Sequence, residues 1–258
     1  MNPSTLPALI ALLCALAGGA PAAGAAPVRD AEGLWAYTGL VTRDGRSLPL
    51  SGLFLIRNGL FVQQSVFDAA PFETAGSMAH AGPYWAGGAG LLLRSRPTLS
   101  LDPTSATPIR SAGAVEHDLK VERRGDTLTL TFGAGRGTVQ TLRRLSAART
   151  ARVFRFEDGA LALAEGYFIL ALGNREYVLS GYGRYTRSER ALDLDITRWA
   201  ESDGAAVRNR KNAALRVSFD GATLGLPDGR RFSTLGPADP DAARMVWEND
   251  PSTAAEQP

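Results

Sequence analysis

The stretch 119–130, LKVERRGDTLTL, has the pattern of two short strands joined by a tight turn, and the stretch 215–226, LRVSFDGATLGL, repeats it at the same spacing. In each, a strand containing Leu and Val leads to a turn with glycine, followed by Thr-Leu-x-Leu. Internal repeats define the unit that folds, so this pair decides the architecture before any single motif does. Short runs of β-branched, aromatic and leucine residues between turn residues predict an all-β protein of antiparallel strands.

Two further blocks recur in the same order. The block 52–59 matches 166–173, and the block 82–93 matches 183–194. A single short match can arise by chance, because strands and turns draw on few residue types. Three matches in one order, each with its internal spacing kept, favour a duplication. We therefore predict two tandem related units, 33–145 and 152–236, with few or no helices between the chain's two ends.

The N-terminal residues 1–26 have the features of a signal peptide. An apolar core, 6–17, is followed by small residues and by Ala-x-Ala sites that end at Ala22 and Ala25. No Lys or Arg precedes the core, so a hydrophobic N-terminal anchor is the alternative. Cleavage would remove Cys14, the only cysteine, and with it any disulfide or thiolate chemistry. We expect a periplasmic or secreted protein.

The rest of the chain excludes several classes of protein. No later apolar run has the length of a membrane-spanning helix. The net charge is +2, without the cluster of Lys and Arg expected of a nucleic-acid-binding protein. The stretches 96–114 and 201–212 are polar or rich in proline and are predicted loops. The tail 237–258 is predicted to be mostly disordered, apart from a short helix between Asp239 and Trp247.

Two predicted strands are apolar on both faces. A strand with one face in water alternates apolar and polar residues, whereas 53–56 and 167–172 do not alternate. This pattern predicts that each unit uses one face of the strand for its own core and the other face to contact the second unit. Burial of the strand within a single sheet would give the same pattern.

The first unit resembles the lipocalin-like barrels over residues 33–145. Gly33-Leu34-Trp35 opens its first strand, and Arg143-Arg144 lies on its last. In that family the tryptophan of a Gly-x-Trp motif closes one end of an antiparallel barrel and packs against a basic residue of the final strand. The resemblance therefore implies a lipocalin-like barrel closed by Trp35, Arg143 and Arg144. The second unit lacks Gly-x-Trp, which leaves open a separate barrel or a half-barrel that completes the first.

The resemblance implies that the barrel holds a small hydrophobic molecule, because eight strands leave room for side chains or for one small ligand. Plain core packing is the alternative for each aromatic residue of the first unit. The candidate ligand-binding residues are Trp35, Tyr37, Phe54, Phe61, Tyr84 and Trp85.

No catalytic residue, metal ligand or cofactor motif is predicted, because no known nucleophile, zinc-binding or phosphate-binding pattern occurs. The two histidines, His80 and His117, could form a metal or proton-transfer site if they met in a barrel. The acids beside His117, Glu116 and Asp118, would point away from it in a strand. We expect a binding protein with no cofactor and an unidentified protein partner, if any. The alternatives are a barrel-type isomerase, cyclase or hydrolase, and a non-catalytic envelope protein that contacts another protein.

Overall fold

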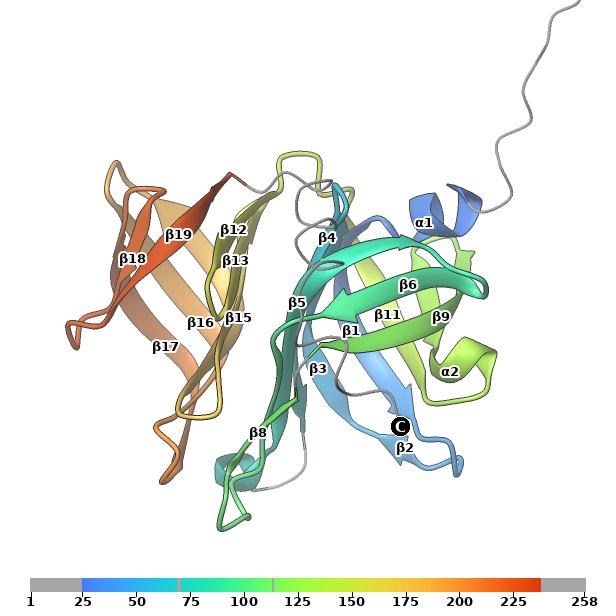
Figure 1. Cartoon of the computed structure of the whole chain (residues 1–258), viewed down its shortest axis with the longest axis horizontal. Coiled ribbons are helices and arrows are strands. Elements are labelled where there is room, and N and C mark those ends of the chain that lie inside the picture. The colour runs from blue at the N-terminus through green and yellow to red at the C-terminus, as the bar shows by residue number, and fades with distance from the viewer. Residues whose placement is uncertain (1–24, 69–70, 113, 238–258) are drawn as a thin grey trace, which may run out of the picture.

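The computed structural model describes residues 25–68, 71–112 and 114–237, which form two closed antiparallel barrels of eight strands each (Figure 1). The predicted all-β fold is confirmed. The predicted C-terminal helix and almost all of the predicted signal peptide lie outside the described residues. Within the described part of the chain, no helix is long and apolar enough to cross a bilayer.

Barrel one is closed by the pairing of its third and fourth strands, β4 and β5. Two additions extend it: β2 (Ser47–Leu48) pairs with β1, and the hairpin of β7 (Thr98–Leu101) and β8 (Ile109–Ala112) continues the sheet from β5. Its eight barrel strands are β1 (Gly33–Val41), β3 (Leu50–Arg57), β4 (Leu60–Phe67), β5 (Ser77–Ala86), β6 (Gly90–Ser95), β9 (Val115–Arg124), β10 (Thr127–Thr131) and β11 (Val139–Ser146). Its helices are α1 (Ala25–Ala31), η1 (Phe72–Thr74) and α2 (Phe132–Gly135).

Barrel two is closed by the pairing of its first and last strands, so the half-barrel alternative is wrong. Closure without a Gly-x-Trp motif has a physical basis. The rings of Phe154 and Phe219 pack edge to face inside the barrel, with 4.8 Å between their centroids. The strands are β12 (Arg152–Phe156), β13 (Gly159–Ala164), β14 (Tyr167–Gly173), β15 (Val178–Arg187), β16 (Ala191–Ser202), β17 (Val207–Phe219), β18 (Thr223–Gly225) and β19 (Arg231–Pro237).

The two stretches predicted as loops, 96–114 and 201–212, contain strand residues. The first holds β7 and β8, and the second holds the end of β16 and the start of β17. The prediction was wrong because polar residues also occur in paired strands. In β7, half-buried Thr98 and Ser100 alternate with the buried Leu99 and Leu101, and at the start of β17 exposed arginines still pair with β16. Figure 1 shows β8 reaching away from barrel one.

The strands of the two barrels correspond one to one in order. The blocks 82–93 and 119–130 fall on β5–β6 and β9–β10, and their repeats fall on the corresponding β15–β16 and β17–β18. The match of 52–59 with 166–173 is wrong by one strand, because β3 is second in its barrel and β14 is third. The counterpart of Gly52 is Gly159. A Cβ on either would lie about 2 Å from a carbonyl oxygen of the next strand, 2.1 Å and 2.0 Å respectively.

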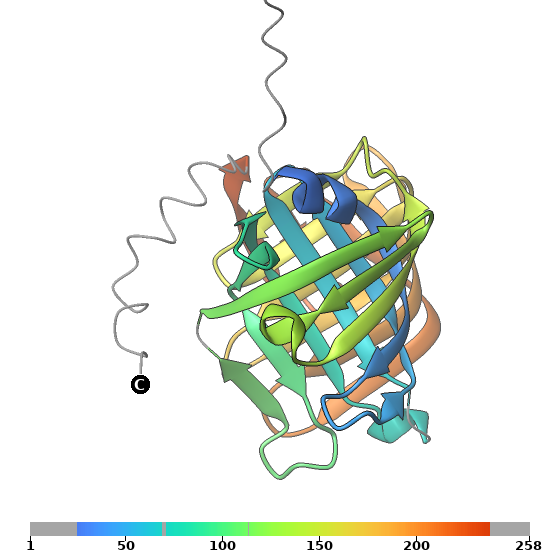
Figure 2. The same cartoon turned by 90° about the vertical axis from the view of Figure 1, so that its right-hand side faces the viewer.

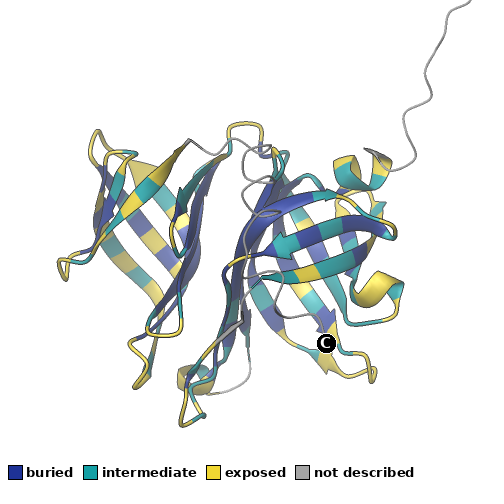
Figure 3. Ribbon diagram, viewed as in Figure 1, coloured by how far each residue is buried: buried dark blue, intermediate teal, exposed yellow. Residues whose placement is uncertain are grey.

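The barrels pack through the outer faces of β4 and β14. β4 contacts β13, β14 and β15, while β14 contacts β3, β4 and β5. Exchanging the barrels maps this set of contacts onto itself, which is the pattern of a pseudo-two-fold interface. Figure 3 shows buried residues on both sides of this seam. The sequence predicts that 53–56, part of β3, and 167–172, part of β14, each use one face for their own core and the other face to contact the second unit. The structure agrees for both strands, although they are not equivalent strands of the two barrels. The interface cluster includes Leu53, Leu55, Val62, Val66, Ala79 and Ala81 of barrel one, and Ala160, Ala162, Ala164, Ile169, Ala171 and Tyr182 of barrel two.

The interface gives a stability test with a matched control. Ala171→Arg places a charge on the fully buried outer face of β14, whereas Ala214→Arg places it on the exposed face of β17. An uncompensated buried charge should lower the free energy of unfolding by about 3 kcal/mol, and the exposed charge should change it little. Equilibrium unfolding in urea measures both variants. Equal effects would contradict the interface.

Candidate functional site

One end of barrel one is sealed by Trp35 and α1. Trp35 is fully buried, and its Nε1 donates a hydrogen bond of 2.8 Å to the carbonyl of Ala31, the last residue of α1. The guanidinium groups of Arg144 and Arg123 lie 5.7 Å and 5.8 Å from the centre of the indole, within cation–π range. Arg143, also predicted at the closure, is exposed on the outer face of β11. Figure 2 shows α1 across this end.

Tyr84 belongs to the sealed end. Its hydroxyl donates a 2.7 Å hydrogen bond to Glu32 Oε1, and Glu32 Oε2 accepts a 2.9 Å bond from Arg57. Burial, together with this carboxylate, raises the pKa of Tyr84. Trp85, its neighbour in the extended strand, is half-buried and points to the outer face. The structure therefore places Trp35, Tyr84 and Trp85 away from the cavity described next.

The other end of barrel one opens into a cavity of about 410 Å³, a volume within the range of small-molecule sites. Three of the predicted residues line it. Tyr37 stacks on Phe54, with ring centroids 6.1 Å apart and planes inclined by 23°, and Phe61 meets Phe54 edge-on at 5.9 Å. The remaining lining residues are Leu40, Thr42, Leu48, Gln63, Ser65, Phe67, Met78, His80, Leu93, His117, Phe132, Thr138 and Gln140.

The inner face of β4 contributes polar side chains to this cavity. Gln63 and Ser65 are buried, and both line it. The Tyr37 hydroxyl donates a 2.9 Å hydrogen bond to Gln63 Oε1. Burial raises the pKa of Tyr37, so its phenol stays protonated at neutral pH. This pair holds an amide and a hydroxyl in fixed positions beside the aromatic wall.

The two histidines meet in the cavity. His80 of β5 and His117 of β9 have nearly parallel rings, inclined by 7°, with centroids 6.0 Å apart. The buried Nε2 atom of each has no hydrogen-bond partner within residues 25–68, 71–112 and 114–237. Burial lowers the pKa of His80 to about 3, with a smaller contribution from His117, and burial also lowers the pKa of His117. Both imidazoles are therefore neutral at neutral pH.

The acids beside His117 do not join this pair. Glu116 forms an ion pair of 3.6 Å with Arg94, and Asp118 accepts a hydrogen bond from the backbone of Ala89. Among the described residues, no group of three or more His, Cys, Asp and Glu side chains could hold a metal ion. The pair is thus a set of neutral hydrogen-bonding groups.

Gln140 completes the polar lining from β11. Its buried Oε1 also has no hydrogen-bond partner in the described part of the chain. Phe132, at the start of α2, packs edge-on against His117 with 5.4 Å between centroids, which fixes one side of the imidazole. Three unpartnered polar groups from three strands thus converge on one mostly apolar cavity.

Barrel two has the same strand order, and apolar side chains pack much of its interior, leaving a pocket of about 120 Å³ beside Trp199 and Leu226. Gly181 occupies in β15 the position that His80 has in β5, two residues before the matched glycines Gly183 and Gly82. A Cβ on Gly181 would lie 2.5 Å from Cε3 of Trp199, so the indole packs directly over this glycine. The buried interior of barrel two is mostly apolar, and one end holds the buried carboxylate of Glu201, which accepts hydrogen bonds from Trp199, Arg208 and Arg210.

The register also identifies what sequence reasoning missed. Gly52 pairs with Ser65 and Gly159 pairs with Leu172, so Ser65 and Leu172 correspond. By the same register, Gln63 corresponds to Leu170. The run Gln63-Gln64-Ser65 inside an apolar strand is the signal that could have pointed to the site. Its polar residues stand out only by comparison with the apolar counterparts Leu170 and Leu172, which requires the strand register.

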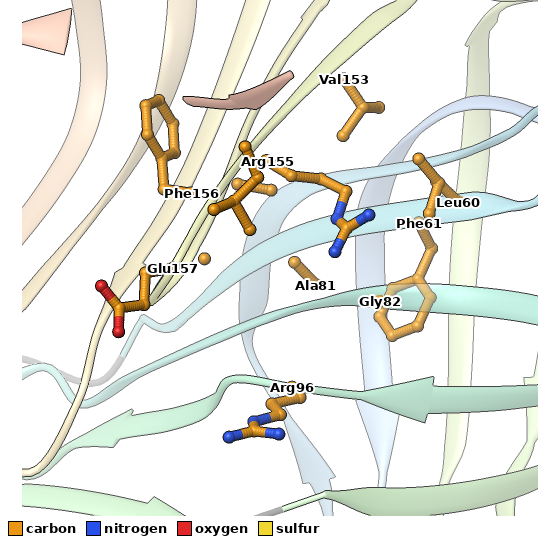
Figure 4. Close-up of a pocket in the computed structure, with 12 residues that line it drawn as sticks. Leu60, Phe61, Ala81, Gly82, Arg96, Val153, Arg155, Phe156 and Glu157 are labelled. Carbon is orange, nitrogen blue, oxygen red and sulfur yellow. The ribbon is translucent and has the colours of Figure 1, made fainter. Parts of the chain in front are cut away.

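Two clefts lie in the seam between the barrels, with volumes of about 210 Å³ and 540 Å³. Figure 4 shows the smaller cleft, where Arg155 reaches towards Leu60 and Ala81 of barrel one while Glu157 points away. Burial lowers the pKa of Arg155. Both clefts are lined by β19 residues just before the described chain ends. The cavity of barrel one is the candidate site, because buried polar groups converge there.

No protein-family model, curated protein or solved structure matches the chain.

The buried His80 makes stability depend on pH. Its pKa is about 3 in the folded chain and about 6.5 when unfolded. Below pH 6.5 His80 binds a proton in the unfolded chain but stays neutral in the folded chain. The free energy of unfolding therefore falls as the pH decreases from 6.5 to about 3. The contribution of neutral His80 to the free energy of unfolding is complete above pH 6.5 and should have fallen by about 2 kcal/mol at pH 5.

His80→Gln should flatten the decline between pH 7 and pH 5, as measured by urea unfolding at each pH. His117 has the same sign of effect and is kept in both proteins, so the difference isolates His80. An unchanged slope in the variant would show that His80 is accessible to protons.

Proposed function

We propose that the protein is an exported, lipocalin-like binding protein that holds one small hydrophobic molecule inside barrel one. The observation that carries this proposal is the cavity of about 410 Å³, which is open at one end and sealed at the other by Trp35. Trp35 beside Arg144 supports the lipocalin-like assignment. The signal-like segment 1–26 supports export to the periplasm or the medium.

The lining favours an apolar guest. The cavity has about the volume that 14 water molecules occupy in the liquid. Water inside it would face Phe54, Phe61, Leu40 and Leu93, which offer no hydrogen bonds. Replacing such water by a ring system removes apolar surface from contact with water, which is the main source of affinity in pockets of this kind.

A barrel-type isomerase, cyclase or hydrolase is the second candidate, and the meeting of His80 with His117 is the observation that favours it. A general base works best with a pKa near the working pH, whereas that of His80 is about 3. The pair is thus better suited to hydrogen bonding than to proton transfer. A scaffold role without a ligand fits barrels whose interiors are packed throughout, but not the open cavity of barrel one.

Filling the cavity should weaken binding of an uncharged fluorescent probe, N-phenyl-1-naphthylamine. Ser65→Leu copies the side chain that barrel two has at this position. The added volume should weaken binding about tenfold or more. Thr129→Leu, on the outer face of β10, is the control and should bind normally. Probe fluorescence during titration gives affinity and stoichiometry, which we expect to be one per chain.

Unchanged binding by a folded Ser65→Leu protein would place the ligand elsewhere, for example in the seam between the barrels. Native mass spectrometry of protein purified from its natural source provides a second measurement. A retained small molecule, one per chain, would support the proposal.

A further inference from the structure

The cavity of barrel one has no charged wall. Among the residues that the structure describes, its lining contains no Lys, Arg, Asp or Glu. The ionisable side chains that do line it are Tyr37, His80 and His117. Burial keeps the phenol protonated and both imidazoles neutral near pH 7. An anionic ligand would therefore lose its hydration without meeting a counter-charge.

The charged groups inside barrel one gather at its sealed end. Arg144 and Arg123 lie over Trp35, and Arg57 pairs with Glu32 beneath Tyr84. None of these four charged residues lines the cavity. The barrel thus has charged side chains at its sealed end and an uncharged cavity lining at its open end, where the ligand enters.

The same cavity is not purely apolar. His80 Nε2, His117 Nε2 and Gln140 Oε1 are buried and have no partner among the described residues. A neutral imidazole nitrogen either donates or accepts a hydrogen bond, and an amide does both. Buried polar groups without partners cost free energy, which a ligand recovers when it pairs with them. A hydroxyl group can donate and accept, and a carbonyl group can accept.

The aromatic side chains of β1, β3 and β4 favour a flat molecule. Tyr37 and Phe54 stack, and Phe61 meets Phe54 at its edge. Aromatic side chains pack well against planar rings, through offset or edge contacts. The polar groups therefore lie in a cavity whose other contacts suit an aromatic or fused-ring skeleton.

We infer that barrel one selects an uncharged ring molecule with a hydroxyl or carbonyl group and rejects the corresponding carboxylate. The histidine pair and Gln140 bind the polar group, and Tyr37, Phe54 and Phe61 contact the ring. This inference rests on the proposed ligand-binding function and specifies its substrate class.

Three ligands with one ring skeleton test the inference on the unmodified protein. At neutral pH naphthalene and 2-naphthol are uncharged, whereas 2-naphthoate is an anion. Isothermal titration calorimetry should rank 2-naphthol tightest, about tenfold over naphthalene for one hydrogen bond gained, with 2-naphthoate weakest. Naphthoate binding as tight as naphthol binding would overturn the inference but leave the proposed function standing. Binding of none of the three would overturn both.

Substitutions then locate the polar contact. His80→Phe and His117→Phe should each lower 2-naphthol affinity towards that of naphthalene while naphthalene affinity stays within about twofold. Glu116→Gln, next to His117 but on the outer face, is the matched control and should change neither. A preference for naphthol that survives in both histidine variants would overturn the role of the pair. If a variant does not fold, the comparison of the three ligands on the unmodified protein still decides.

Discussion

The fold depends on one buried contact, the crossing of β4 and β14 between the barrels. Alanines at 160, 162 and 171 let the two sheets approach closely, and Leu53 and Val62 of barrel one pack on them. Interiors of proteins are close-packed, so side chains this small bring the sheets together. The contact buries the outer faces of strands that also line a barrel, which explains why β3 and β14 are apolar on both faces where an ordinary half-exposed strand alternates.

Different side chains close the corresponding ends of the two barrels. Phe154 of β12 is the counterpart of Trp35 of β1. Trp35 pairs with Phe54, two residues after Gly52, and Phe154 pairs with Leu161, two residues after Gly159. Arg123 and Phe219 each precede the glycine of the following turn by two residues. A cation over an indole in barrel one thus corresponds to an aromatic pair in barrel two. Ends closed in either way leave the interiors free to diverge.

The sequence was sufficient to predict what depends on local pattern. Strand periodicity and turn glycines predicted the all-β class and the two units, and the alternation along β1 put Trp35 and Tyr37 on the inner face, of which only Tyr37 lines the cavity. The meeting of His80 with His117 required the lateral order of β5, β6 and β9, which depends on non-local pairing. Register likewise decided which of Tyr84 and Trp85 points inward. A one-residue shift reverses every such assignment.

An open cavity destabilises the barrel that contains it, and barrel two offsets this cost. Unfilled volume and unpartnered buried polar groups both lower stability. Part of the polar lining of barrel one lies on β4 and β5, as Gln63, Ser65 and His80. The outer faces of these same strands carry Val62 and Ala79, which are buried against barrel two. Barrel two therefore buries the outer faces of β4 and β5, whose inner faces line the cavity. This apolar burial offsets the cost of a hollow, polar-lined interior in barrel one.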